Sequence, residues 1–283
     1  MTRRKRSSHP AGPRVAFQGE RGAYSEGAAR KLFGASIRPL PCPTFDGIFE
    51  AVHRGRARYG LIPIENSLAG SIYRNYDLLL ENRLQIVAEV NYRVRHNLLA
   101  LPGVRMEAVR RVLSHPVALE QCRRFLGRRR WETVIAHDTA GAARRIREEG
   151  GRDMAAIAGR EAARHYRMSV LAAGIEDNPA NYTRFFALAR SGRPLGRADK
   201  TSIVFALADR AGALFKSLSV FALRDINLTK IESRPIHGSP WEYYFYIDFH
   251  GSMANGVCRA AISHLREIAS FLKVLGSYPR ARR

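Results

Sequence analysis

The sequence predicts an α/β protein of two parts, and three observations lead to this prediction. Short aliphatic runs alternate with helical patterns from Val15 to about Arg190, which is typical of a sheet with mostly parallel strands. The polar stretch SGRPLGRADK (191–200) contains glycine and proline and is typical of a linker. From Thr201 the order of elements changes to strand, helix, two strands, helix and strand.

Hydrophobic periodicity places the individual elements of both parts. In the first part, strands are expected at RVAFQG, YGLIPIE, LQIVAEV, RRVLSHP, TVIAH, MAAIAG and TRFFALA, and helices at 25–33, 44–54, 71–81, 116–127, 138–148 and 159–166. In the second part, strands are expected at TSIVFALA, INLTKIESRP, EYYFYIDFH and FLKVLGSYP, and helices at GALFKSLSVFALR and VCRAAISHLREIAS. This β-α-β-β-α-β order is that of the ferredoxin-like fold.

The composition is that of a globular protein. The chain has 283 residues, of which 46% are hydrophobic, and this length is enough for one large or two moderate domains. No run approaches the roughly 18 apolar residues that cross a bilayer, so we expect no membrane partner. The basic, polar opening (1–13) contains no apolar run, and we expect a disordered tail there and not a secretory signal.

The cysteines and histidines argue against disulfides and metal sites. Cys42, Cys122 and Cys258 are odd in number and widely spaced, which favours free thiols in a reducing compartment, and we expect a cytoplasmic protein. The histidines form no HxxxH pattern and no cluster with cysteine. No glycine spacing fits a Walker or dinucleotide fingerprint. We therefore expect no metal and no cofactor.

The formal net charge of +22 raises the question of nucleic-acid binding. Arginine is scattered along the whole chain and forms no stripe interleaved with aromatic residues, so we expect no nucleic-acid partner. A positive field would also draw small anionic substrates toward the protein.

Two segments place polar residues between a strand and a following helix, where open α/β sheets bind ligands. In FQGERGAYSEGAA, we expect Ser25, next to Tyr24, to cap a helix whose free N–H groups favour an anion; an ordinary capped helix is the alternative. In YGLIPIENSLAGSI, Glu65, Asn66 and Ser67 follow an apolar strand, and the alternative is an Asx-type turn.

Two further segments follow the same pattern. In VLSHPVALEQC, Ser114 can cap a helix that reaches Gln121, with Pro116 near its first position; the alternative is a purely structural cap at Ser114 beside a turn histidine, His115. In NYTRF, Thr183 can donate a hydrogen bond and Arg184 can clamp a carboxylate. Together the four segments predict a pocket that holds a small polycarboxylate by oriented dipoles, with little strong acid–base machinery.

The same segments resemble those of the prephenate dehydratases, and more closely those of their arogenate dehydratase relatives. The similar stretches are GERGAYSE (19–26), GLIPIENSLAGSI (60–72), LSHPVALEQC (113–122), DTAGAA (138–143), NYTRF (181–185) and FALRDINLTKIESRP (221–235). They are long, keep the order of the family and extend over nearly all of the chain from Val15 to Pro279.

The resemblance implies a two-lobed catalytic domain like a type II periplasmic binding protein (14–190) and, after the linker, an ACT regulatory domain with the ferredoxin-like order (201–279). It implies conversion of prephenate to phenylpyruvate, or of arogenate to phenylalanine, with loss of carbon dioxide and water. It assigns the catalytic role to Thr183, with support from Asn66, Ser114 and Gln121. Substrate binding falls to Tyr24, Ser25, Glu65, Ser67, Arg184 and Phe185.

The resemblance further implies that phenylalanine acts as an effector and that the protein is a homodimer or homotetramer. The implied phenylalanine site comprises Gly212, Ala213, Leu214, Asn227, Leu228, Glu232, Ser233 and Arg234. Tyr182 lies where prephenate and arogenate would be told apart. The alternatives are a non-catalytic amino-acid sensor, because the same fold also binds ligands without chemistry, and a nucleic-acid-binding protein.

Overall fold

The computed structural model describes residues 12–281, which divide into two compact units. Unit 1 contains residues 12–75 and Val90–Phe185, and unit 2 contains Tyr76–Glu89 and residues 186–281. The sequence-based boundaries at 14–190, 191–200 and 201–279 remain predictions, and the expected tail (1–13) lies almost wholly outside the described residues.

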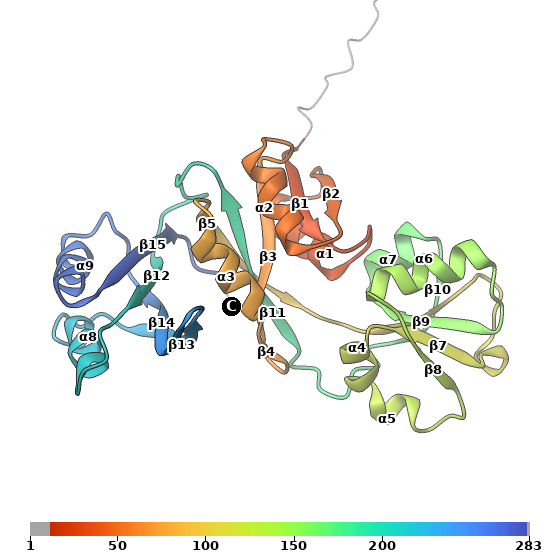
Figure 1. Ribbon diagram of the computed structural model, residues 1–283. Helices are drawn as coiled ribbons and strands as arrows, with labels where there is room; N and C mark the ends of the chain where they lie inside the picture. The colour runs from red at the N-terminus through yellow and green to blue at the C-terminus, as the bar shows by residue number, and fades with distance from the viewer. Residues whose placement is uncertain (1–11, 282–283) are drawn as a thin grey trace, which may run out of the picture. The chain divides into compact units, whose positions relative to one another are not determined.

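The first sheet of unit 1 has the order β2-β1-β3-β11-β5, with β4 paired to β3 (Figure 1). Its strands are β1 (Arg14–Gln18), β2 (Arg38–Cys42), β3 (Tyr59–Asn66), β4 (Gly70–Ser71), β5 (Gln85–Arg93) and β11 (Tyr182–Ala189). β1 pairs in parallel with β2 and β3, as expected for strands joined by the helices α1 (Tyr24–Phe33) and α2 (Phe45–His53). Strands β5 and β11 continue from one unit into the other.

The second sheet of unit 1 has the order β10-β6-β9-β7-β8. Its strands are β6 (Asn97–Ala100), β7 (Arg111–Ser114), β8 (Glu132–Ile135), β9 (Met154–Ala158) and β10 (Ser169–Ala173); its helices are η1 (Met106–Ala108), α4 (Pro116–Glu120), α5 (Arg123–Leu126), α6 (Thr139–Glu149) and α7 (Arg160–His165). β7 is parallel to β8 and β9, whereas β6 is antiparallel to β9 and β10. The sheet is therefore mixed, and less parallel than predicted.

Unit 2 is built on an antiparallel sheet with the order β13-β14-β12-β15. Its elements are β12 (Lys200–Ala206), α8 (Ala213–Ala222), β13 (Leu228–Ile236), β14 (Ser239–His250), α9 (Gly256–Ile268) and β15 (Phe271–Tyr278), which confirms the predicted β-α-β-β-α-β order. Its core includes Phe205, Phe221, Phe249 and Ile262. Lys200, expected to end the linker, is the buried first residue of β12.

Helix α3 (Tyr73–Glu81) also belongs mostly to unit 2. Lys273 Nζ donates to the carbonyl oxygens of Leu79 (2.9 Å), Leu80 (2.9 Å) and Asn82 (2.6 Å), and thereby satisfies acceptors at the end of the helix. Burial lowers the pKa of Lys273. The division into two units therefore follows packing and not chain order.

Two predicted helix caps are wrong. Helix α1 begins at Tyr24 after Ala23, so Ser25 lies inside the helix and is buried. Ser114 is the last residue of β7, and its Oγ donates to the carbonyl of Ile157 on the neighbouring strand (2.7 Å). His115 caps α4 instead, accepting from the N–H of Val117. The predicted single helix over 116–127 is interrupted after Glu120, giving α4 and α5.

Candidate functional site

A cavity of about 350 Å³ lies in unit 1 where segments from its two sheets come together. Asn66 ends β3 and Thr183 begins β11, both in the first sheet, while His115 and Gln121 flank α4 beside the second. The cavity is lined by Tyr24, Asn66, Ala69, Gly70, Ser71, Ile72, Val94, His96, His115, Val117, Ala118, Gln121, Asp138, Thr139 and Thr183. Four of the residues with predicted roles, Tyr24, Asn66, Gln121 and Thr183, thus line one cavity.

The hydroxyl of Thr183 is held as a donor toward this cavity. Asn66 Nδ2 donates to Thr183 Oγ1 (3.0 Å), and Thr183 is largely buried, with 8% exposed. The Asn66 amide cannot be turned around, because its Oδ1 already accepts from the backbone N–H groups of Leu68 (3.0 Å) and Ala69 (2.9 Å). With Oγ1 accepting from the amide, the Thr183 proton remains for a partner in the cavity.

A chain of hydrogen bonds continues from Asn66 across the cavity wall. Asn66 Nδ2 donates to Asn181 Oδ1 (2.8 Å), and Asn181 Nδ2 donates to Gln121 Oε1 (2.8 Å). His96 Nε2 lies 2.9 Å from the same Gln121 oxygen, and His96 Nδ1 lies 2.8 Å from the hydroxyl of Tyr24. Because the Gln121 oxygen can only accept, His96 carries its proton on Nε2 and accepts from Tyr24 at Nδ1.

Burial keeps these groups neutral. Desolvation lowers the pKa of His96 below its ordinary value, against the opposing effects of the Gln121 hydrogen bond and Glu176. Burial likewise raises the pKa of Tyr24 well above its usual value. The pKa of His115 is lowered by burial although Asp138 acts in the other direction. The wall of the cavity is therefore neutral around His96, and it offers N–H and O–H donors.

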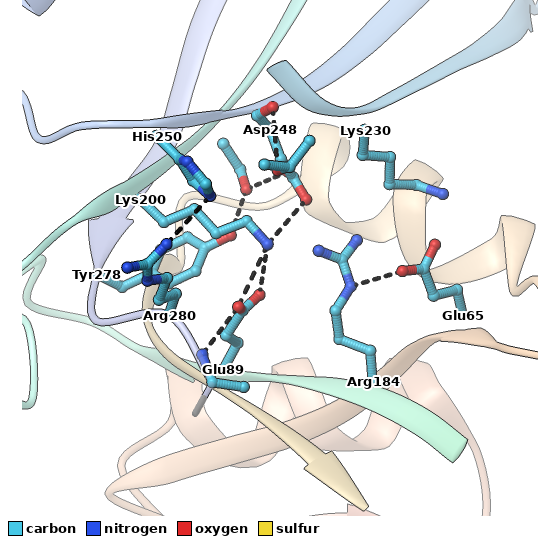
Figure 2. A network of polar contacts seen from close by, with 12 residues as sticks. Glu65, Glu89, Arg184, Lys200, Lys230, Asp248, His250, Tyr278 and Arg280 are labelled. Carbon is cyan, nitrogen blue, oxygen red and sulfur yellow. Dashed lines mark hydrogen bonds and ion pairs between the residues drawn. The ribbon is translucent and has the colours of Figure 1, made fainter. Parts of the chain in front are cut away.

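Arg184 does not line the cavity. Successive residues of a strand point to opposite faces, so Thr183 and Arg184 diverge. Arg184 Nε pairs with Glu65 Oε1 at 2.9 Å, and its side chain is 10% exposed (Figure 2). Both residues of this pair were expected to hold substrate, and the structure instead joins them to each other.

The remaining predicted substrate residues also lie outside the lining. Ser67 Oγ donates to the carbonyl of Ala180 (2.8 Å) and accepts from the N–H of Tyr182 (2.9 Å), so it ties β3 to the segment before β11. Phe185 is buried in the core with 2% exposed, and Ser25 is buried in α1. Ser114, predicted to support catalysis, is held by the backbone of β9. Tyr182 is 44% exposed and does not line the cavity.

Sequence reasoning missed His96 and Asn181. His96 directly precedes β6, and Asn181 directly precedes β11, so both lie at the start of a strand and not after its end. Asn181 is fully buried and His96 is 2% exposed. A search for polar residues at the start of a strand, as well as at its end, would have found them.

The residues of the expected effector site lie in unit 2, in three places. Gly212, with φ of +75°, precedes α8, and this helix begins with Ala213 and Leu214. Asn227 and Leu228, at the start of β13, line a second cavity of about 1210 Å³. Farther along β13 lie Glu232, Ser233 and Arg234; Glu232 pairs with Lys230 (3.2 Å) and Arg234 with Asp77 (3.1 Å).

Residues 12–281 show neither a metal-binding cluster nor a membrane-spanning helix. No group of three or more His, Cys, Asp and Glu residues in this range could hold a metal ion. Within the same range, no helix is long and apolar enough to cross a membrane. The three cysteines are all buried as free thiols.

Sequence comparison identifies a family that matches most of the dehydratase-like region. Residues 15–193 match the family described as prephenate dehydratase. The chain is 51% identical over 277 residues to arogenate dehydratase/prephenate dehydratase 2, chloroplastic, of Arabidopsis thaliana, which covers 94% of this chain and 72% of that protein. It is 49% identical to arogenate dehydratase 2 of Petunia hybrida, and the match covers 94% of this chain and 71% of that protein.

Solved structures agree with this result. The prephenate dehydratase of Arthrobacter aurescens in complex with L-Phe has a TM-score of 0.85 at 33% identity and covers 95% of this chain and 90% of that one. GqqA, described as a novel type of quorum quenching acylase, has a TM-score of 0.87 at 36% identity, with 94% and 98% covered. From the family match and the Arabidopsis relative together, the chain belongs to the prephenate dehydratase family.

Proposed function

We propose that the chain is a decarboxylating dehydratase that acts on prephenate, on arogenate or on both. The reaction removes the ring carboxylate as carbon dioxide and the ring hydroxyl as water, and it leaves an aromatic ring. The electron pair of the broken C–C bond enters the ring as the C–O bond breaks. Since the aromatic product supplies the driving force, the protein has to orient the substrate and assist the departing hydroxide.

In this proposal Thr183 is the catalytic residue that meets the departing oxygen. The Asn66 amide donates to Thr183 Oγ1, and this one contact carries the proposal, because it leaves the hydroxyl proton for the leaving group. The departing hydroxide takes the Thr183 proton and becomes water, and a proton from solvent then restores the threonine hydroxyl, so each turnover consumes one proton. A threonine hydroxyl is a weak acid, so its contribution depends on this fixed direction more than on its acidity.

Gln121 holds the substrate in this proposal through a neutral donor, while Asn66 and Tyr24 donate their own protons to Thr183, Asn181 and His96 and so fix the cavity wall. Gln121 Oε1 accepts from Asn181 and His96, and its Nε2 is left as a donor for a carboxylate. Asn181 and His96 act as positioning residues, since their hydrogen bonds fix the orientation of the Gln121 amide. We assign Ser114 a structural role through its bond to Ile157, and we assign Arg184 a structural role through Glu65.

The test is turnover of prephenate and arogenate by Thr183→Ala. We expect kcat to fall by about 10²-fold or more, the usual scale of general-acid assistance, with the melting temperature retained. Thr133→Ala is the matched control, because Thr133 is exposed on β8 and does not line the cavity. A fall of less than threefold in Thr183→Ala would contradict the assigned role.

An acylase is the second candidate, because the chain is 36% identical to GqqA. Release of free amine from an acylated amine substrate, without turnover of prephenate or arogenate, would favour that function. A non-catalytic sensor would bind prephenate or arogenate and convert neither. The same set of assays therefore separates the three functions.

The C-terminal elements support a regulatory role, and we propose that they form an ACT domain that binds phenylalanine. The L-Phe complex of the Arthrobacter relative supports this proposal. The expected effector residues are distributed along α8 and β13, so we also propose that a homodimer or homotetramer completes the site. Calorimetry of phenylalanine binding to the full chain tests this, and no heat of binding would contradict it. The buried free thiols support a reducing compartment such as the cytoplasm.

A further inference from the structure

The charge of the cavity wall is unusual for a site that binds a dianion. Among the described residues that line the cavity, none is lysine or arginine, and one, Asp138, carries a carboxylate. The two lining histidines have pKa values lowered by burial. Prephenate has two carboxylates and no positive charge, so it would gain no ion pair from this wall and would face the carboxylate of Asp138.

Asp138 is fixed in position by the helix that follows it. Its Oδ1 accepts from the N–H of Gly141 (2.7 Å), which makes it the N-cap of α6. Gly141 has no side chain, and a Cβ atom there would lie 3.0 Å from Asp138 Oδ2. The carboxylate therefore lies against the helix start, with its side chain 22% exposed.

The second oxygen of this carboxylate is available to a ligand. Within the described residues, Oδ2 accepts no hydrogen bond, and its nearest cationic candidate is His137 Nδ1 at 3.7 Å, on a side chain that is 83% exposed. An ionised carboxylate accepts several hydrogen bonds, and a primary ammonium donates three. Thr139, the next residue, also lines the cavity and adds a hydroxyl beside Asp138.

Resting on the dehydratase function proposed above, we propose that Asp138 is the residue that selects arogenate over prephenate. The two substrates differ only in the side chain, where arogenate has an ammonium and prephenate a keto oxygen. Asp138 pairs with the ammonium and repels the lone pairs of the keto group. The neutral donors of the wall then hold the two carboxylates, and the substrate enters with a net charge of −1 instead of −2.

The discriminating variant is Asp138→Asn, which removes the charge and keeps a good N-cap residue. In wild-type protein we expect kcat/KM for arogenate to exceed that for prephenate by at least about tenfold. In Asp138→Asn we expect kcat/KM for arogenate to fall about tenfold to a hundredfold, the range for a hydrogen bond between charged groups. Most of this change is expected in KM, and kcat/KM for prephenate is expected to stay or rise.

Asp46→Asn is the matched control, because it removes the same charge from an exposed helix start in the same unit. Asp46 is the second residue of α2, pairs with Arg74 and does not line the cavity. We expect this variant to keep the wild-type ratio of the two kcat/KM values. An equal change of the ratio in both variants would assign the effect to the general field of the protein and would overturn the proposal.

Binding measurements separate this proposal from the proposed chemistry. Calorimetry with both substrates on Thr183→Ala, and on Thr183→Ala combined with Asp138→Asn, reports affinity without turnover. Tighter binding of arogenate that is lost with Asp138→Asn supports the proposal even if wild-type turnover is absent, in which case only the proposed function fails. Equal affinity for both substrates, an unchanged ratio in Asp138→Asn, or binding of neither substrate would overturn the selection by Asp138.

Discussion

Replacement of Lys200 by methionine should strongly destabilise unit 2. Lys200 Nζ lies 2.9 Å from Glu89 Oε2, 3.2 Å from Glu89 Oε1 and 3.6 Å from Asp248 Oδ2 (Figure 2). The exposed fractions of the three side chains are 8%, 4% and 7%. Methionine fills much of the same volume but removes the ammonium that faces these two buried carboxylates.

The expected loss follows from the cost of breaking a buried ion pair on one side, about 3–5 kcal/mol. The carboxylates keep some hydrogen bonds, since Ala281 N donates to Glu89 Oε1 (2.9 Å) and Ser202 Oγ donates to Asp248 Oδ1. We therefore expect the lower part of this range, about 3 kcal/mol. This is a large share of the total free energy of unfolding of a typical protein, which is about 5–15 kcal/mol.

Urea unfolding of the full chain measures this loss. With a slope of about 1–3 kcal/mol per molar, the midpoint of the transition should move down by at least about 1 M. Lys216→Met, on the exposed face of α8, is the control and should leave the midpoint unchanged. The combination of Lys200→Met with Glu89→Gln and Asp248→Asn should recover part of the lost free energy of unfolding, because it also removes the charges of the two buried carboxylates. A midpoint for Lys200→Met within 0.3 M of wild type (about 0.3–0.9 kcal/mol at these slopes) would refute the reasoning.

Two further predictions concern the pH dependence of the site and the packing of unit 2. Burial lowers the pKa of His96, so the imidazole stays neutral as the pH falls below 6.5. We therefore expect kcat/KM to stay constant through pH 6.5 and to fall only at lower pH, because a protonated Nδ1 cannot accept from Tyr24. The free energy of unfolding should be highest above pH 6.5 and should fall as the pH drops from 6.5 toward the lowered pKa of His96. A fall in kcat/KM or in stability that begins at or above pH 6.5 would contradict this. Gly276→Ala should lower the melting temperature markedly, because the new Cβ would clash with the carbonyl oxygen of Ile86. Gly34→Ala leaves open space around the new Cβ and, despite its φ of +90°, should cost less.

The order of the elements could be predicted because each helix and strand follows from the residue pattern of its own segment. The continuous run of aromatic and β-branched residues in EYYFYIDFH and the apolar face of VCRAAISHLREIAS identify β14 and α9 without knowledge of any distant contact. The cap predictions failed for a local reason as well. Ser25 and Ser114 are of the right residue type for caps, but α1 begins one residue earlier and Ser114 remains in a strand.

The grouping of the elements could not be predicted in the same way. Residues 76–89 lie in the middle of the region expected to form the first domain, and they pack with unit 2. The groups that hold them there include Lys273, which donates to carbonyl oxygens at the end of α3, and Lys200, which pairs with Glu89. Each joins residues more than 100 positions apart, and no local pattern reports such a pairing. The amphipathic pattern of α3 predicts that one face of the helix is buried, but it does not identify the part of the protein that covers this face.

Local sequence rules predict only part of the candidate site. Thr183 and Arg184 were both predicted to face the substrate, yet the two-residue period of a strand already requires that neighbours point apart. That rule, applied to NYTRF alone, would have assigned one of the two to another partner. Which of them faces the cavity depends on Asn66, 117 positions earlier, whose amide donates to Thr183 Oγ1. The direction of the threonine proton is therefore a property of the folded chain, set by the turn after β3 that fixes the Asn66 amide.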